Sequence, residues 1–477
     1  MKRSLVAAVL SLSFFFIAIT PTLARIDPMP IDVLVIGGTP AGVAAAVAAA
    51  RRGQNVELVS RRARLGGILT DAMMDQWDLN LGRNGSAIEG GIFREIYREI
   101  GDSFTPDSAA AAFERIVARE PRIHVVRSET PLAVETQTIQ GLQTITSVTF
   151  RATHGRETLR ASAPYIIDAS DDGDVAALAG ARYDIGRQDT GADERTQPVT
   201  LMFTIDGVDW QRVVATYDVA RFGFGGAIDR RAWGYDRLMQ AYAPSANDVL
   251  VRDLNLGHED GGSVTVNAID ILGIDGLNDA DIARARLLTQ REAPLLIAFL
   301  RQRLPGFERA RLGRFADAVY VRETRHFAGL ERLTADDVWG GHEPTDTIGL
   351  SSYPLDLHPV TAREKPAFAP VRHVYGLPFG AMVPRGFGNL LLASPAISAS
   401  HLASGSARII PTTIEEGEAA GAAAALAAKL AMSFPAIVRD ARAMDALQSN
   451  LVRGGVLLSA TAALTTASRA RMASRIA

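Results

Sequence analysis

A glycine-rich turn is the part of the sequence best suited to hold a phosphate group. It reads Gly37-Gly38-Thr39-Pro40-Ala41-Gly42 and follows a short, β-branched apolar run. Glycines let a pyrophosphate approach the backbone, and the start of a helix offers free N–H groups and a positive dipole end. Thr39 stands where the dinucleotide fingerprint has its second glycine, so its Cβ could crowd the phosphate and its hydroxyl could donate to it. A plain tight turn in an α/β protein is the alternative interpretation.

The ribose of a dinucleotide usually needs a carboxylate at the end of the second strand. Ser60 occupies that position, and Glu57 falls on the opposite face of the strand by simple alternation. The usual contact is therefore missing or replaced by a hydroxyl. Arg61, Arg62 and Arg64 follow. They could favour the extra phosphate of NADP, but a solvated basic loop is the simpler interpretation.

The elements around this turn form a βαβ unit. Residues 31–36 are typical of a buried strand, residues 40–52 of a helix packed through alanines, and residues 56–60 of a second strand. This order implies a parallel sheet. Further elements are expected as helices at 93–100, 109–119 and 414–430, as sheet strands at 123–126, 165–168 and 389–394, and as an antiparallel meander over 132–136, 145–152 and 157–161, with a hairpin at 154–155.

The middle of the chain has a different character. Trp210, Trp233 and Trp339 lie there, together with a long arginine-rich helical segment at 279–303. We predict an α/β protein with a Rossmann-type domain and β-meander built from residues 25–184 and 376–477, and an inserted α+β substrate domain at 185–375. Residues 223–226 are glycine-rich but follow no clear strand, so we expect a loop there rather than a second nucleotide site.

Residues 1–24 resemble a secretory signal peptide. Lys2 and Arg3 precede an apolar run over residues 5–19, and Thr22-Leu23-Ala24 is a small-x-small cleavage signal. We expect an exported protein, periplasmic or secreted, with no stable membrane span after cleavage. An uncleaved N-terminal anchor is the alternative.

Composition excludes several classes of site and partner. The formal net charge of −3 gives no reason to expect nucleic acid as a partner. The chain has no cysteine, which excludes disulfides, thiolate metal sites and a cysteinyl flavin link. The histidines lack metal-ligand spacing, and no Gly-x-Ser-x-Gly elbow indicates a hydrolase. We therefore expect no metal site.

Several further motifs together resemble a known family. They are Leu65-Gly66-Gly67-Ile68-Leu69-Thr70, the run from Asp168 through Ala169 and Ser170 to Asp174, Arg322-Glu323-Thr324-Arg325, and a C-terminal stretch that contains Ser394, His401, Arg408, Gly417 and Gly421. This pattern is similar to the bacterial FAD-dependent oxidoreductases of the two-dinucleotide-fold type, some of which have a xanthan-lyase-like label. The resemblance covers nearly all of residues 25–477.

The resemblance implies a bound FAD and places residues along it. The glycine turn, Ser60, Arg61, Gly66 and Gly67 are expected on the cofactor, with Asp168, Ala169, Ser170, Asp174, Ser394, Gly417 and Gly421. A helix that starts near Thr413 would direct its positive end at the flavin. His401 could transfer protons, and Arg408 could hold a carboxylate or the flavin's negative charge. A structural histidine and a core-pairing arginine are the alternatives.

We therefore expect an exported FAD-dependent oxidoreductase that acts on a small organic substrate through a non-covalently bound flavin, with an electron donor or acceptor that stays open. An NAD(P)-dependent oxidoreductase would bind a nicotinamide cofactor and no flavin. A flavin monooxygenase would consume oxygen and hydroxylate its substrate. A non-catalytic nucleotide-binding envelope protein would show neither flavin nor turnover, and Ser60 and Thr39 keep this possibility open.

Overall fold

A five-stranded parallel sheet lies at the centre of the computed structural model, which describes residues 30–82 and 85–461. Its strands have the order β23 (Leu390–Leu392), β7 (Tyr165–Asp168), β1 (Val33–Ile36), β2 (Val56–Ser60) and β3 (Ile123–Arg127). Every neighbouring pair is parallel. A strand from near the end of the chain therefore completes a sheet begun at its start, and the predicted α/β class with a Rossmann-type sheet is confirmed.

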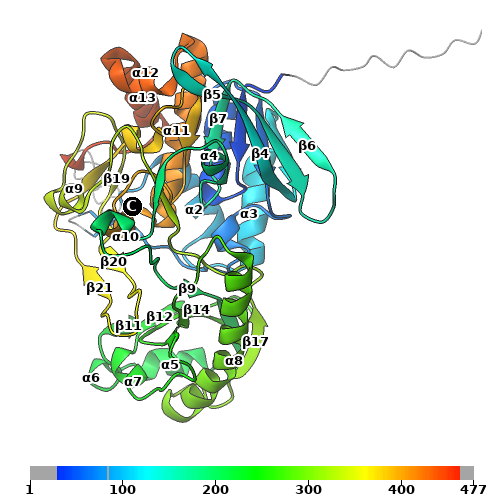
Figure 1. The fold of residues 1–477 in the computed structure, drawn as a ribbon. Coiled ribbons are helices and arrows are strands. Elements are labelled where there is room, and N and C mark those ends of the chain that lie inside the picture. Colours follow the sequence, from blue (N-terminus) through cyan, green and yellow to red (C-terminus); the bar gives the residue numbers. More distant parts are fainter. Residues whose placement is uncertain (1–29, 83–84, 462–477) are drawn as a thin grey trace, which may run out of the picture. The chain divides into compact units, whose positions relative to one another are not determined.

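Helices α1 (Pro40–Arg51) and α11 (Ile410–Leu430) pack closely on each other, and Figure 1 shows the orange α11 beside the blue N-terminal strands. Their contact depends on glycine, because a Cβ at Gly417 would lie 2.1 Å from the carbonyl oxygen of Ala41. The sequence placed the start of this helix at 414. It begins at Ile410 because Pro411 is accommodated in the first turn, where no backbone donor is needed.

A three-stranded antiparallel meander lies between the parallel strands β3 and β7 in the sequence, as predicted. It consists of β4 (Glu129–Ile139), β5 (Leu142–Ala152) and β6 (Thr158–Ala161), in that spatial order. The predicted hairpin at 154–155 lies between β5 and β6. The β4–β5 hairpin is longer than predicted, since Gln140 and Gly141 both have positive φ and turn the chain tightly.

The middle of the chain builds a six-stranded antiparallel sheet with its own hydrophobic core. The strand order is β11 (Gly225–Ala227), β12 (Arg231–Gly234), β14 (Leu254–His258), β15 (Val264–Asn267), β10 (Phe203–Asp206) and β17 (Arg311–Phe315). The long helix α8 (Asp279–Arg303) packs near β17, as Figure 1 shows. The prediction of a loop over 223–226 is wrong for its last two residues, which belong to β11. Glycine at 225 makes this pairing possible because it lets β11 approach the backbone of Trp233.

The remaining helices are α2 (Gly91–Ile100), α3 (Pro106–Ala118), α4 (Asp174–Leu178), α5 (Trp210–Thr216), α6 (Val219–Phe222), α7 (Asp236–Met239), α9 (Ala335–Gly340), α10 (His401–Ala407), α12 (Phe434–Arg439) and α13 (Ala441–Gly454), with the 3-10 turns η1 (Gly67–Leu69), η2 (Gln188–Thr190) and η3 (Phe379–Met382). The remaining strands are β8 (Tyr183–Ile185), β9 (Val199–Thr200), β13 (Val249–Leu250), β16 (Asp270–Ile271), β18 (Arg325–Phe327), β19 (Thr347–Ser351), β20 (Leu355–Leu357), β21 (Ala367–Ala369) and β22 (Tyr375–Pro378).

Two predictions of the sequence are not tested by these elements. The domain boundaries at residues 184 and 376 stay predictions. The signal peptide predicted at 1–24 lies outside the described residues. Among the residues that are described, no helix has the length and the apolar character needed to cross a membrane.

Candidate functional site

The glycine turn joins β1 to α1 and lies against the end of β7. Gly37 has φ +116°, and a Cβ there would lie 2.2 Å from the carbonyl oxygen of Ala169. The Thr39 hydroxyl donates to that same oxygen at 2.9 Å and accepts from the Gly42 N–H at 3.0 Å. Thr39 therefore acts as the N-cap of α1 and ties the turn to β7. Its hydroxyl is engaged within the protein, although the sequence also allowed it to donate to a phosphate.

The second glycine pair lies directly beside the first. The N–H of Gly66 donates to the carbonyl oxygen of Gly38 at 2.7 Å. Gly66 and Gly67 both have positive φ, and a Cβ at Gly66 would meet the ring of Phe113. Ser60 lies behind the turn, since a Cβ at Gly38 would lie 2.4 Å from the Ser60 hydroxyl oxygen. Two glycine motifs that are separate in sequence thus form one surface.

The end of β7 folds back on itself. The Asp168 carboxylate accepts from the Ser170 N–H and hydroxyl and from the Ala176 N–H, at 3.1, 2.5 and 2.9 Å. The Ser170 hydroxyl oxygen in turn accepts from the Asp174 N–H at 2.8 Å. Asp168 therefore holds the turn into α4, and Ser170, Asp171, Asp172 and Asp174 are the members of this motif that line the cavity described next.

These elements line one large cavity with about 1710 Å³ of space that no protein atom fills, its open mouth included. Its walls come from both parts of the predicted Rossmann-type domain and from the middle of the chain. Of the predicted site residues, those that line the cavity are Gly37, Gly38, Thr39, Pro40, Ala41, Ser60, Arg61, Gly67, Ser170, Asp174, Ser394 and Arg408.

The other predicted site residues lie outside the lining, namely Gly42, Gly66, Asp168, Ala169, Gly417, Gly421 and His401. Gly417 and Gly421 have a packing role. A Cβ at Gly421 would lie 2.2 Å from the carbonyl oxygen of Ala45, just as one at Gly417 would meet the backbone of Ala41. These two glycines therefore let α11 reach α1, whose first residues line the cavity.

The N-terminal end of α11 opens onto the cavity. Ile410 and Thr413 line the wall, and Ser394 lies beside them after β23. The N-cap residue, Ile409, gives this helix no side-chain hydrogen bond within the described structure. The positive end of a 21-residue helix is thus presented to the cavity without a capping oxygen.

Arginines and carboxylates share another stretch of the cavity wall. Arg64 forms ion pairs with Asp71, Asp107 and Asp317 at 3.4, 3.0 and 3.3 Å. Burial and neighbouring carboxylates raise the pKa of Asp171 to about 7. The charge of Arg64 is therefore already matched by protein partners.

Arg408 is held in place by two partners at the cavity wall. Its Nη1 donates to the Tyr320 hydroxyl at 2.6 Å, and its Nη2 donates to the Asp356 carbonyl and carboxylate oxygens at 3.2 and 3.3 Å. The guanidinium of Arg322 lies over the Tyr320 ring, 4.7 Å from its centroid. Tyr320 and Arg408 both line the cavity. Because the Tyr320 oxygen accepts from Arg408, its own proton stays available to a molecule in the cavity.

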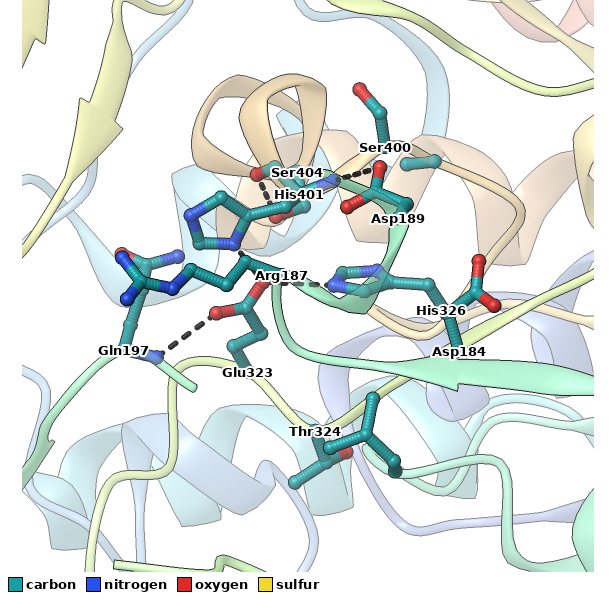
Figure 2. A network of polar contacts seen from close by, with 12 residues as sticks. Asp184, Arg187, Asp189, Gln197, Glu323, Thr324, His326, Ser400, His401 and Ser404 are labelled. Carbon is teal, nitrogen blue, oxygen red and sulfur yellow. Dashed lines mark hydrogen bonds and ion pairs between the residues drawn. The ribbon is translucent and has the colours of Figure 1, made fainter. Parts of the chain in front are cut away.

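His401 belongs to a buried network instead, which Figure 2 shows. One oxygen of the Glu323 carboxylate contacts His401 Nδ1 at 2.7 Å and His326 Nε2 at 2.8 Å, and the other accepts from the Gln197 N–H at 2.9 Å. Burial opposes ionisation, yet the hydrogen bonds from His326 and His401 lower the pKa of Glu323 to about 2. Glu323 lines the cavity, so His401 lies one residue behind its wall.

Sequence reasoning missed several wall residues. Tyr320 lies in no motif, and only its proximity to Arg322-Glu323-Thr324-Arg325 in the sequence could have drawn attention to it. Glu129 was missed because nothing in the sequence shows that the start of β4 reaches the same edge as the glycine turn. Four cavity-lining groups are buried without a hydrogen-bond partner among the described residues, namely Glu129 Oε2, Asp71 Oδ2, Arg325 Nε and Arg408 Nε.

Comparison with known proteins identifies the kind of protein. The family model described as FAD dependent oxidoreductase matches residues 32–451. A search of curated proteins gives no match. The chain is similar to solved structures of THI4 from Thermovibrio ammonificans (20% identity, TM-score 0.27, covering 33% of this chain and 66% of that one) and of a geranylgeranyl bacteriochlorophyll reductase-like protein from Thermoplasma acidophilum (13%, 0.41, 89% and 86%).

A third similar structure is a p-nitrophenol 4-monooxygenase from Pseudomonas putida DLL-E4 (12% identity, TM-score 0.37, covering 93% of this chain and 92% of that one). The chain thus spans just under two thirds of the Thermovibrio protein and most of the other two.

Proposed function

The chain belongs to the FAD-dependent oxidoreductase family, and from this premise we propose that it oxidises or reduces a small organic substrate through a non-covalently bound FAD. The observation that supports this most directly is one cavity that has features for the nucleotide of FAD and features for the flavin ring and the substrate. The glycine turn and the start of α1 form one part of its wall. The start of α11, Arg408 and Tyr320 form another.

The residues present fit the cofactor. The start of α1 and the backbone around Gly38 suit a pyrophosphate, because the glycines allow close approach and the helix presents its positive dipole end there. The uncapped start of α11 suits the electron-rich edge of a reduced flavin. Two buried groups in the wall, an acceptor on Glu129 and a donor on Arg408, have hydrogen-bonding capacity that the described residues leave unused.

FAD, when bound, supplies hydride or electron transfer. The chain's own contribution is to position and to protonate. Asp356 fixes the guanidinium plane of Arg408, and Arg408 orients the Tyr320 hydroxyl so that its proton can be donated to a substrate oxygen or nitrogen. His401 holds a proton next to the ionised Glu323 and serves in this proposal as a positioning residue behind the wall.

We also propose that the protein is exported and that it is related to the family members that have a xanthan-lyase-like label. The sequence of residues 1–24 supports export to the periplasm or beyond. The similarity to family members with a xanthan-lyase-like label rests on the quoted motifs alone. Mass measurement of the mature N-terminus, with fractionation of the producing cells, tests the export proposal, and a full-length cytoplasmic protein would refute it.

A visible absorption spectrum of the purified protein, taken before and after heat denaturation, tests the central proposal. We expect a flavin spectrum and release of all the cofactor on denaturation, with the mass of FAD. Flavin that stays with the denatured chain would refute non-covalent binding. A colourless protein that also fails to take up FAD would refute the proposed function.

A further inference from the structure

We propose that Glu129, rather than the residue that ends β2, binds the hydroxyl groups of the adenosine ribose of FAD. If FAD is bound as in the proposed function, some side chain of this protein must recognise the ribose in its nucleotide half. A dinucleotide site of this kind ordinarily uses a carboxylate at the end of the second strand for that purpose. Here that strand ends in Ser60.

Ser60 is poorly placed to replace that carboxylate. It is 1% exposed, and its hydroxyl donates to the Arg62 carbonyl oxygen at 2.9 Å and accepts from the Arg62 N–H at 3.2 Å. It therefore stabilises the bend of its own loop. One hydroxyl with these two bonds cannot also accept from two neighbouring ribose hydroxyls, which need two acceptor oxygens.

Glu129 lies at the same edge of the sheet. In the parallel register of β2 and β3, Ser60 is paired with Arg127, and Glu129 follows two residues later as the first residue of β4. Both Ser60 and Glu129 line the cavity, as does Arg61. The carboxyl ends of β2 and β3 thus bring the Glu129 side chain to the region where a Rossmann-type sheet receives the ribose.

The backbone around Glu129 is held firmly. Glu129 is paired with Ala152 in the β4–β5 ladder. The Thr153 N–H donates to the Ser128 carbonyl oxygen at 2.7 Å, and the Thr153 hydroxyl donates to the Arg61 carbonyl oxygen at 3.3 Å. The loop after β2 and the start of β4 are therefore connected through one residue. A side chain on such a frame is preorganised for a ligand.

The carboxylate has an unmet requirement that a ribose would satisfy. Its Oε2 is buried and has no hydrogen-bond partner within the described part of the chain. A buried acceptor without a donor is unfavourable, and two adjacent hydroxyls donate to the two oxygens of one carboxylate. The second strand, β2, ends without a carboxylate, and the first residue of β4 supplies one at the same edge of the sheet.

Titration of the apoprotein with FAD and with FMN tests the assignment, because FMN lacks the adenosine ribose. We expect Glu129→Gln to weaken FAD binding about tenfold or more, since hydrogen bonds to a charged group are the stronger kind. FMN affinity should stay within about twofold of the wild type. Glu135→Gln, on the exposed part of the same strand, is the matched control and should change neither affinity.

Competition with ADP and 2′-deoxy-ADP gives an independent readout. We expect the wild type to prefer ADP, and the preference to disappear in Glu129→Gln. Ser60→Ala should keep the preference. Unchanged FAD affinity in Glu129→Gln, an equal loss for FAD and FMN, or a preference that survives the substitution would each overturn the assignment. A wild type that binds neither flavin would overturn both this assignment and the proposed function.

Discussion

Replacement of Thr39 by alanine should destabilise the protein itself and leave its affinity for FAD nearly unchanged. The Thr39 hydroxyl makes two bonds within the protein, one from the Gly42 N–H at the start of α1 and one to the Ala169 carbonyl oxygen at the end of β7. Loss of an N-cap costs about 1 kcal/mol. A buried carbonyl left without its donor costs about 1 kcal/mol more. The expected decrease in the free energy of unfolding is thus about 2 kcal/mol.

Urea unfolding followed by tryptophan fluorescence, with and without saturating FAD, measures this decrease. Because a ligand stabilises by mass action, equal decreases in the apo and FAD-bound proteins mean that the affinity is unchanged. Thr39→Ser keeps the hydroxyl and removes one methyl group, so it should cost about 1 kcal/mol or less. If Thr39→Ala left the apoprotein at full stability but weakened FAD binding tenfold, the hydroxyl would serve the phosphate and our reasoning would be refuted.

Four further substitutions, one of them a matched control, test other parts of the structure. Gly417→Ala should cost about 1–3 kcal/mol in the free energy of unfolding, because its Cβ would lie 2.1 Å from a backbone oxygen of α1, whereas Gly340→Ala, whose Cβ meets nothing within 4 Å, should be neutral or stabilising. Burial raises the pKa of Glu89 to about 7 in the folded protein, so the folded state favours the neutral carboxyl group. The stability that this group contributes is complete below about pH 4.5 and is lost as the pH rises to 7. Glu89→Gln should recover about 3 kcal/mol in the free energy of unfolding at pH 8. The pKa of Glu323 is lowered to about 2, so its contribution is present above about pH 4.5 and is lost as the pH falls; Glu323→Gln should cost about 3 kcal/mol at pH 7 and little near pH 2.

Measurement of the free energy of unfolding at several pH values, and comparison of Gly417→Ala with Gly340→Ala, test these expectations. Equal costs for the two glycine substitutions would contradict the packing explanation. A Glu89→Gln protein that is no more stable than the wild type at pH 8 would show that this carboxyl group ionises freely in the folded state. A Glu323→Gln penalty that persists unchanged at pH 2 would assign the loss to packing rather than to the charge.

The sequence predicts the parallel sheet and its glycine turn well, because their signals are local. A β-branched run, a glycine turn and an alanine-rich helix within residues 31–60 leave few alternatives to a βαβ unit. The β-meander was also predictable from alternation, apart from the extra length that the turn at Gln140 allows. These features depend on neighbours in the sequence.

The site was only partly predictable, because its remaining residues depend on contacts between distant segments. Gly417 looks like a cofactor glycine in the sequence, yet its neighbour is the backbone of Ala41 on another helix. His401 looks accessible, yet it binds a carboxylate 78 positions away and lies behind the wall. Tyr320 carries no signal until the fold brings Arg408 against it. Such pairings become visible only once the elements are placed.

The packing of α11 on α1 also determines when, during synthesis, this part of the protein can fold. Pro40 and Ile410 are 370 residues apart (410 − 40), and a ribosome that adds 5–20 residues per second needs roughly 20 to 70 seconds to pass from one to the other. For that interval α1 has no partner for the alanine face that α11 later covers, and β7 lacks its neighbour β23. Nascent chains at this stage expose apolar surface that chaperones recognise. We expect the cavity to form, and the flavin to be captured, only after the last fifth of the chain has emerged.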